Sequence, residues 1–319
     1  MKTPNVSILI PVYNRENFIA ACIESALSQT FSNIEVIVVD NASTDRTWDV
    51  CKHYAAIDSR VRIFRNDENV GPVRNWLRCA AEARGAYGKM LFSDDLMFPH
   101  FLEKTLPYLE DADVAFVSTS ALLGETPATG VVLYNNMPRG AQRVSSEQYF
   151  NFLIPNKRFQ IPYSPGAAIF RMADIRANLR ISIQTKNIHD FTKNGAGPDV
   201  LLFALTTLNY KNVVMLSQTE VFFRVHQGSF TILDSGNEVT QGYRIAIAWF
   251  CKNKLSKRHW ARYVARAWLS DMKKTRSLIS PNKYAASYEG EGTAGEVGAI
   301  ILSAFSILIS PLKLFAEKI

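Results

Sequence analysis

The chain has 319 residues, of which 47% are hydrophobic and 20% are charged, and its formal net charge is +7. This composition is ordinary for a globular core and excludes a disordered or fibrous chain. The cysteines Cys22, Cys51, Cys79 and Cys251 form no CxxC pair, and the sequence shows no secretory signal. We therefore expect reduced cysteines in a cytoplasmic protein.

Predicted strands and helices alternate along the N-terminal third of the chain. Apolar, β-rich runs at 6–14, 34–39, 61–64 and 90–92 alternate with helical patterns at about 17–30, 44–56 and 71–83. Alternation at this spacing is typical of βαβ units, so we expect an α/β fold with a largely parallel, doubly wound sheet. No GxGxxG follows any of these runs, so the dinucleotide-binding fingerprint is missing.

Two adjacent acids, Asp94 and Asp95, end the apolar run that begins near Lys89. Ligands of open α/β sheets bind beyond the carboxyl ends of the strands. Carboxylate oxygens there suit Mg²⁺ or Mn²⁺, and such a cation suits a diphosphate. Taken alone, the pair favours a solvated turn that caps the helical pattern starting near Pro99. The motifs around it change that interpretation.

Six motifs, in this order along the chain, together resemble the family 2 glycosyltransferases, which have the GT-A fold. The resemblance extends to about residue 230 and leaves the rest unmatched. It implies a GT-A domain at 1–235, with a Rossmann-like, mostly parallel central sheet and flanking helices, followed by a helical C-terminal region at 236–319. The motifs are Pro11-Val12-Tyr13-Asn14, the run 40–45, Asn69-Val70-Gly71, Ser93-Asp94-Asp95, Gly197-Pro198-Asp199-Val200-Leu201 and Phe223-Arg224-Val225-His226.

The resemblance implies a nucleotide-sugar donor, in the first instance a UDP-sugar. Asp40 would accept a hydrogen bond from the uracil N3–H. Pro11, Tyr13 and Asn14 would wall the same base pocket. Arg74 would reach the donor phosphates, although it equally fits a solvated helix face.

The acid pair would serve the ribose and a metal ion. Asp94 would contact the ribose hydroxyls and Asp95 would ligate the metal, with their exact division left open. The family pattern is Asp-x-Asp-Asp, and Phe92 stands here at the first acidic position. Few carboxylates suit Mg²⁺, whereas His226, which resembles a histidine of the GT-A metal shell, suits Mn²⁺, so either ion is expected. Arg224, on the same strand face as His226, would bind the diphosphate or pair with an acid.

Inverting transfer requires a base that deprotonates the acceptor hydroxyl. The resemblance gives this role to Asp199, which follows the flexible turn 195–198, and stabilisation of a helix N-terminus is the competing interpretation. Asp190 is the alternative base. Gly166, in a turn before an apolar run, would form the wall between donor sugar and acceptor. The remaining histidines are predicted to be structural: His53, His100, His189 and His259.

The positive charge is concentrated in residues 251–283, where ten Lys or Arg face one acid, Asp271. That segment carries +9, which leaves −2 for the rest of the chain. Aromatic residues alternate with these charges, and a basic helix with an aromatic face is typical of an anionic membrane surface. No nucleic-acid motif accompanies it, so we expect no nucleic-acid partner. A calmodulin-like partner helix is a further alternative.

An uncharged stretch at 297–312 follows a linker rich in Gly and Glu at 288–296. A membrane span takes about 20 apolar residues, so this stretch is short, and Pro311 interrupts it. We expect it to lie in the membrane interface, with the basic segment on anionic headgroups. Packing on the catalytic domain is the alternative.

Taken together, these patterns predict an inverting, metal-dependent glycosyltransferase of bacterial surface-polysaccharide synthesis. Its acceptor would be a saccharide, expected to be lipid-linked, and the protein would be peripheral at the inner face of the cell membrane. A nucleotidyltransferase that makes nucleotide sugars is a second hypothesis, although its Gly-rich phosphate loop is missing. A non-catalytic nucleotide- or carbohydrate-binding protein is a third, for which Phe92 leaves room.

Overall fold

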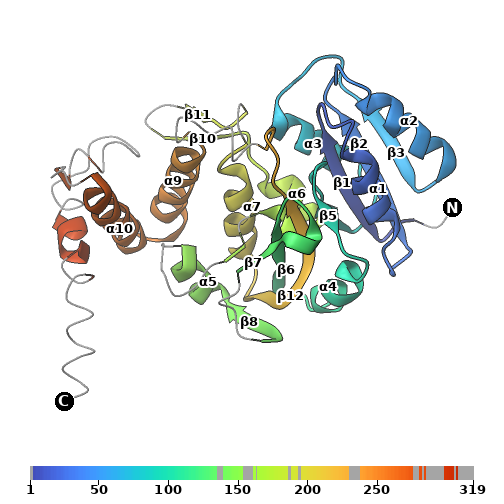
Figure 1. Cartoon of the computed structure of the whole chain (residues 1–319). Coiled ribbons are helices and arrows are strands. Elements are labelled where there is room, and N and C mark those ends of the chain that lie inside the picture. The colour runs from blue at the N-terminus through green and yellow to red at the C-terminus, as the bar shows by residue number, and fades with distance from the viewer. Residues whose placement is uncertain are drawn as a thin grey trace.

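The structure is a computed structural model with a layered α/β arrangement (Figure 1). Strands and helices alternate along the N-terminal third, and the elements described from residue 238 onward are all helices. Residues described are 3–134, 139–153, 161–162, 164–185, 188–192, 195–229, 238–275, 280–281, 284, 298–304 and 307.

Four parallel strands form the N-terminal half of the central sheet. Their spatial order is β3-β2-β1-β4. All residues of β1 and β2 are buried, as expected where helices cover both faces of a parallel sheet. The parallel arrangement is thus confirmed, with the fourth strand a few residues earlier than the sequence predicts. The strands are β1 (Val6–Val12), β2 (Ile34–Asp40), β3 (Val61–Arg65) and β4 (Tyr87–Met90).

The other half of the sheet is mixed. β9 (Ala168–Arg171) lies between β4 and β6 (Val114–Gly124) and runs antiparallel to both. β12 (Asn212–Arg224) pairs parallel with β6, and β5 (Leu96–Met97) pairs antiparallel with β12. Most of the pairing in the sheet is therefore parallel. Shorter strands are β7 (Val131–Leu133) on β6, β8 (Ala141–Ser145) on β12, and the separate pair β10 (Ser182–Gln184) and β11 (Ile188–Asp190).

Alternating side chains of the strands feed two hydrophobic cores, one on each face of the sheet. In β1, Ile8 and Ile10 join one core and Leu9 joins the other. Helices α1 (Ile19–Leu27), α2 (Thr47–Ile57) and α4 (Phe101–Leu109) cover the first face. The second face is covered by α3 (Pro72–Glu82), α5 (Ser146–Leu153), α6 (Met172–Asn178) and α7 (Pro198–Thr207).

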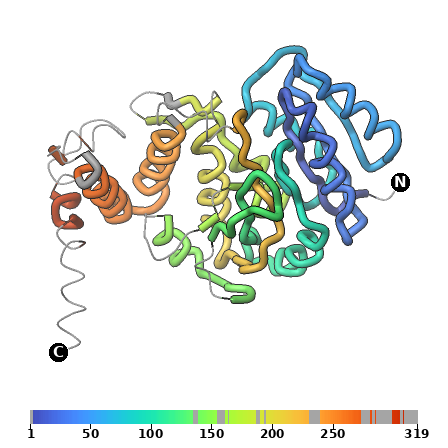
Figure 2. The backbone as a smooth tube through the Cα atoms, in the orientation of Figure 1, coloured from blue at the N-terminus to red at the C-terminus, as the bar shows by residue number. Residues whose placement is uncertain are grey.

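Two C-terminal helices extend the second core outward. α9 (Glu238–Phe250) packs on α7, and a π-helical turn at Cys251–Leu255 connects it to α10 (Lys257–Thr275). Figure 2 traces both helices on the far side of α7 from β1 and β2. All of α7 is buried as a result.

The aromatic residues of this C-terminal part lie inside the protein. Phe250, Trp260 and Tyr263 expose 2% of their surface or less and belong to the second core. The prediction that this aromatic face meets a membrane is therefore wrong for these three residues. The reason is that the same amphipathic pattern serves a helix that packs on α7 and its neighbours.

The apolar stretch predicted at 297–312 is described only at 298–304 and 307. There Ile300 and Ala304 are buried in the second core, whereas Leu302 is 72% exposed. Over these residues the stretch packs on the rest of the chain, which was the alternative to membrane insertion. Within the described residues, no helix combines the length and apolar character that crossing a bilayer requires.

Candidate active site

The loops that follow β1 and β2 are braced against each other at the carboxyl edge of the sheet. The N–H of Asn14 donates to Ser43 Oγ at 2.9 Å, and the N–H of Thr44 donates to Asn14 Oδ1 at 2.9 Å. Asn14 has a φ of 50°, which asparagine tolerates better than most residues. Pro11 is buried in β1 and Tyr13 is 39% exposed, so Tyr13 presents the open surface of this predicted base pocket.

Asp40 ends β2 beneath this surface. Its carboxylate accepts a hydrogen bond from the N–H of Ser43 and pairs with Arg65 Nε at 3.0 Å. The Asp40 side chain has no exposed surface. In this arrangement Asp40 holds the loop after β2, and its predicted bond to uracil stays a prediction that requires Arg65 to move.

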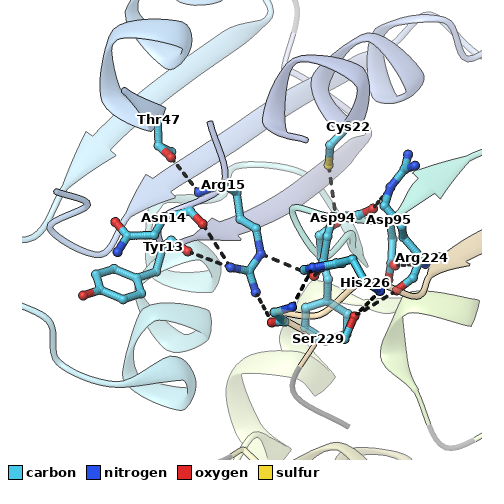
Figure 3. Close-up of polar contacts among 12 residues, drawn as sticks. Tyr13, Asn14, Arg15, Cys22, Thr47, Asp94, Asp95, Arg224, His226 and Ser229 are labelled. Atoms are coloured by element: carbon cyan, nitrogen blue, oxygen red, sulfur yellow. Dashed lines mark hydrogen bonds and ion pairs between the residues drawn. The ribbon is translucent and has the colours of Figure 1, made fainter. Parts of the chain in front are cut away.

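The acid pair lies beside the end of β12, because β5, which follows the pair directly, pairs with β12 (Figure 3). Asp94 Oδ2 lies 3.0 Å from His226 Nε2, and the backbone oxygen of Asp94 accepts from Arg224 Nε at 2.9 Å. Asp95 is buried, and its Oδ1 accepts from the backbone N–H of Arg224 at 2.9 Å. Four predicted site residues, separated by about 130 positions along the chain, are thus brought together.

A fifth residue, Arg15, joins the same cluster and is missing from the sequence prediction. Its Nε lies 3.4 Å from Asp94 Oδ2, and its other nitrogens donate to the backbone oxygens of Asn14 (3.0 Å) and Gly228 (3.2 Å). Arg15 therefore connects the base-pocket loop, the acid pair and the turn after β12. Its position directly after Asn14, at the end of a parallel strand, was the signal that could have found it.

His226 is held in one tautomer by its neighbours. The N–H of Gly228 donates to Nδ1 at 3.1 Å, so Nδ1 carries no proton and Nε2–H faces Asp94. The ring also packs on Phe18, with centroids 4.6 Å apart. A histidine that ligates a metal through Nε2 needs a free lone pair there. Metal ligation by His226 therefore requires this turn to rearrange.

The acid pair is compatible with a divalent ion, although the protein groups are few. Among the described residues no cluster of three or more His, Cys, Asp or Glu is arranged to hold a metal, and Phe92 offers no ligand. Mg²⁺ is usually held by one or two carboxylates together with substrate phosphates, so Asp94 and Asp95 satisfy that requirement. Burial and the adjacent Asp94 carboxylate raise the pKa of Asp95 well above its usual range. A cation would reverse this, because it favours the ionised form.

Gly166 and a buried lysine lie behind the acid pair. Lys89 has no exposed surface, and its Nζ donates to the backbone oxygens of Met90 (2.8 Å) and Gly166. Burial lowers the pKa of Lys89 to about 7. A Cβ at Gly166 would lie 3.0 Å from the ring of Phe223, so a side chain would crowd this predicted wall. Sequence alone gave no sign that Lys89 enters the core.

The predicted base, Asp199, starts α7 in a turn that needs glycine. Gly195 and Gly197 have φ values of 69° and 115°, a region that residues with a Cβ rarely adopt. Asp199 Oδ1 accepts from the N–H groups of Gly197 (3.1 Å) and Val200 (2.8 Å), and Oδ2 accepts from the hydroxyl of Tyr243 on α9. Burial raises the pKa of Asp199 to about 6.

Asp199 reaches the acid pair indirectly, through aromatic side chains. A Cβ added at Gly195, in the turn before Asp199, would lie 3.1 Å from the indole of Trp76. Trp76 in turn contacts Phe92, with ring centroids 5.3 Å apart. Phe92, which stands where the family pattern has an acid, thus contacts the ring that packs against the turn before Asp199. The alternative base, Asp190, is exposed and accepts from the N–H of Thr192.

The remaining predicted residues fall as follows. The side chain of Arg74 is exposed on the first turn of α3, a position that leaves both of its interpretations open. Buried, free thiols are found at all four cysteines. His53 lies beside Tyr54, His100 pairs with Glu103 and His259 bonds to Ser256, while the side chain of His189 lies outside the described residues. The structural role of these histidines stays a prediction.

Comparison with solved structures supports the fold. S. aureus TarS 1–349 in complex with UDP-GlcNAc superposes with a TM-score of 0.68, over 93% of this chain and 83% of that one, at 17% identity. The same TarS fragment in complex with UDP gives a TM-score of 0.65. At this identity the similarity establishes the GT-A fold and nothing finer.

Comparison with known sequences identifies the family. "Putative glycosyltransferase EpsH" of Bacillus subtilis is 33% identical over 159 residues, which are 49% of this chain and 45% of that protein. "Putative teichuronic acid biosynthesis glycosyltransferase TuaG" of the same species is 34% identical over 116 residues, 36% of this chain and 46% of that protein. The match thus spans less than half the length of these relatives. The model of glycosyl transferase family 2 matches residues 7–175, more than half of the chain, and the protein therefore belongs to that family.

Proposed function

We propose that the protein transfers a sugar from a nucleotide-sugar donor to a saccharide acceptor at the carboxyl edge of its sheet. The observation that carries this proposal is the cluster of Asp94 and Asp95 with Arg15, Arg224 and His226. Family membership supports the reaction class, and the UDP-GlcNAc complex of TarS supports a UDP-sugar as donor.

The donor would lie across the cluster, from the base pocket to the acid pair. Tyr13, Asn14 and Asp40 would form the base pocket, and Asp94 would reach the ribose. Arg15 connects the two regions, since it contacts both Asn14 and Asp94. Its guanidinium and that of Arg224 are placed to bind the diphosphate, because arginine matches phosphate oxygens in charge and geometry.

A divalent ion completes this proposal. Family 2 enzymes generally use one, and here Asp94 and Asp95 would hold Mn²⁺ or Mg²⁺ together with diphosphate oxygens. When bound, the ion would supply positive charge to the leaving diphosphate. His226 donates to Asp94 in the present arrangement and would fix the orientation of that carboxylate.

Asp199 would act as the base of an inverting displacement. The acceptor hydroxyl gives its proton to Asp199 Oδ2 while its oxygen bonds to the anomeric carbon. The bond from that carbon to the diphosphate breaks, and the electron pair leaves with the nucleoside diphosphate. Burial raises the pKa of Asp199 to about 6, closer to neutral pH, where a carboxylate is a more effective base.

The acceptor is proposed to be a lipid-linked saccharide at the inner face of the cell membrane. The similarity to TuaG, which is named for teichuronic acid biosynthesis, supports a surface polysaccharide as the product. Exposed cations at the corner between α9 and α10 would meet anionic headgroups, since each such charge near a membrane surface contributes about 1 kcal/mol. These cations are Lys254, Lys257 and Arg258.

A donor panel tests the proposal. Purified protein is titrated with UDP by calorimetry, and UDP release is followed from UDP-GlcNAc, UDP-glucose and UDP-galactose, with Mn²⁺, with Mg²⁺ and with EDTA. We expect UDP binding and slow UDP release from at least one sugar, stronger with the metal, and both lowered by Asp95→Ala. Protein that binds no UDP and releases none under any of these conditions would contradict the proposed function.

A further inference from the structure

The carboxylate of Asp199 receives a hydrogen bond from a helix that lies outside the central sheet. The donor is the hydroxyl of Tyr243, which lies 44 positions further along the chain, on α9. The family model ends at residue 175, well before either residue. We propose that Tyr243 is a positioning residue for the catalytic base, so that α9 forms part of the active centre. This inference rests on the proposed role of Asp199.

The hydrogen bond from Tyr243 leaves one acceptor position of the Asp199 carboxylate open. An ionised carboxylate accepts about four hydrogen bonds, two on each oxygen. Oδ1 accepts from the N–H groups of Gly197 and Val200, and Oδ2 accepts from Tyr243. The one remaining acceptor position is therefore on Oδ2, where an incoming hydroxyl would deliver its proton. Because both oxygens are anchored, the carboxylate plane is fixed relative to α7.

Close packing holds Tyr243 in register with Asp199. Gly242 sits against the turn that precedes α7, and a Cβ added there would approach Ala196 O to 2.6 Å. A Cβ at Gly197 would in turn lie 3.1 Å from Gly242 O. Two glycines thus let α9 approach the Asp199 turn without intervening side chains.

The hydrogen bond between Tyr243 and Asp199 is not a surface contact. Asp199 is 6% exposed, and burial raises its pKa while the Tyr243 hydrogen bond opposes that rise. Arg244, the residue after Tyr243 on α9, forms a bidentate ion pair with Asp271 of α10, with hydrogen bonds of 2.6 and 2.7 Å. Arg244 is thus held toward α10, and the hydroxyl of Tyr243 is the α9 group that bonds the carboxylate.

Tyr243→Phe tests the inference, with Tyr210→Phe as a matched control. Tyr210 makes the same kind of bond, its hydroxyl donating to Asp174 at 2.7 Å, just beyond the opposite end of α7. The readouts are the UDP dissociation constant by calorimetry, and kcat and KM for UDP release from UDP-GlcNAc with Mn²⁺, where water takes the acceptor's place. Thermal melting checks that each variant is folded.

We expect Tyr243→Phe to lower kcat about tenfold or more, the effect of losing one hydrogen bond to a charged group, with UDP affinity and KM nearly unchanged. Tyr210→Phe should leave kcat unchanged. In the Asp199→Asn background Tyr243→Phe should have no further effect, because the two residues act as one unit.

Each other outcome is decisive. If Asp199→Asn keeps most of its activity, the proposed base is wrong and the role of Tyr243 falls with it. If Asp199→Asn is inactive while Tyr243→Phe behaves like the natural protein, only the inference on Tyr243 fails. If Tyr243→Phe loses UDP affinity and kcat together, Tyr243 has a purely structural role and the inference is overturned.

Discussion

At the scale of single residues, Arg15 differs from the structural arginines of the chain. Arg244 pairs with Asp271 through two hydrogen bonds of 2.6 and 2.7 Å, the geometry of a strong ion pair. Arg15 instead makes one long contact of 3.4 Å with Asp94 and spreads its other nitrogens over backbone oxygens. Because its other partners are neutral backbone oxygens, a single long ion pair neutralises the charge of Arg15, which leaves that charge able to attract an anionic ligand.

The first prediction follows for Arg15→Met. Losing charge-assisted hydrogen bonds to a diphosphate costs about 1.5–3 kcal/mol, so UDP affinity should fall about 10- to 100-fold. Uridine, which has no phosphate, should bind the variant and the natural protein equally. Calorimetry with both ligands measures this, and Arg143→Met, which removes an exposed arginine paired with Asp111, is the control. Equal UDP affinity in both variants would exclude Arg15 from the diphosphate site.

The second prediction concerns pH. Because burial raises the pKa of Asp199 to about 6, the base is protonated and inactive below that pH and ionised above it. The kcat for UDP release should therefore rise with pH through about 6 and level off near neutrality. The residual activity of Asp199→Asn should lack this limb. A limb that persists in Asp199→Asn would assign it to another group.

At the scale of elements, the sequence predicted the N-terminal strands and helices well. Their order rests on local hydrophobic periodicity, which a single sequence displays. The place of β9 between β4 and β6 could not be predicted, since that pairing joins segments more than 50 residues apart along the chain. The contact between Tyr243 and Asp199 is non-local in the same way. Periodicity also cannot tell a helix face that meets a membrane from one that packs on protein, which is why the aromatic face of α10 was misassigned.

The third prediction concerns the turn before α7. In Gly197→Ala the residue must adopt a φ of 115°, and its Cβ would lie 2.5 Å from the ring of Phe191. The free energy of unfolding should fall by more than about 1 kcal/mol, which lowers the melting temperature by at least about 1.5 °C in a chain of 319 residues. Gly298→Ala is the control, because its Cβ meets nothing within 4 Å. Calorimetric melting curves compare the two, and similar melting temperatures would refute the strain.

At the scale of the whole molecule, the positive charge is concentrated in and around α10, on the far side of α7 from the base pocket (Figure 1). Burial of Phe250, Trp260 and Tyr263 removes these three rings from membrane contact, so attraction there rests mainly on charge. Charge attraction is screened beyond a Debye length of about 8 Å at physiological ionic strength. Membrane association through this surface should thus be reversible and sensitive to salt.

The fourth prediction tests that surface by co-sedimentation with vesicles of phosphatidylserine and phosphatidylcholine. Changing Lys254, Lys257 and Arg258 together to Gln should lower binding at low salt about 100-fold, since each charge contributes about 1 kcal/mol and the three together about 3 kcal/mol. A control with the same charge change is Lys52, Arg143 and Lys211 to Gln, all exposed and on other elements. Equal losses in both triple variants would show that net charge, and no particular surface, drives binding.

The buried Lys89 has a consequence for how the protein withstands changes of pH. Burial lowers the pKa of Lys89 to about 7, whereas a lysine in the unfolded chain keeps a value of about 10.4. Between these values the unfolded chain binds the extra proton, so the free energy of unfolding should rise with pH, by up to about 1.4 kcal/mol per unit. The free energy of unfolding should therefore be larger at mildly alkaline pH than at neutral pH. Lys89→Met should flatten that rise, because methionine has no group that titrates. A chain selected for stability alone would carry an apolar residue there.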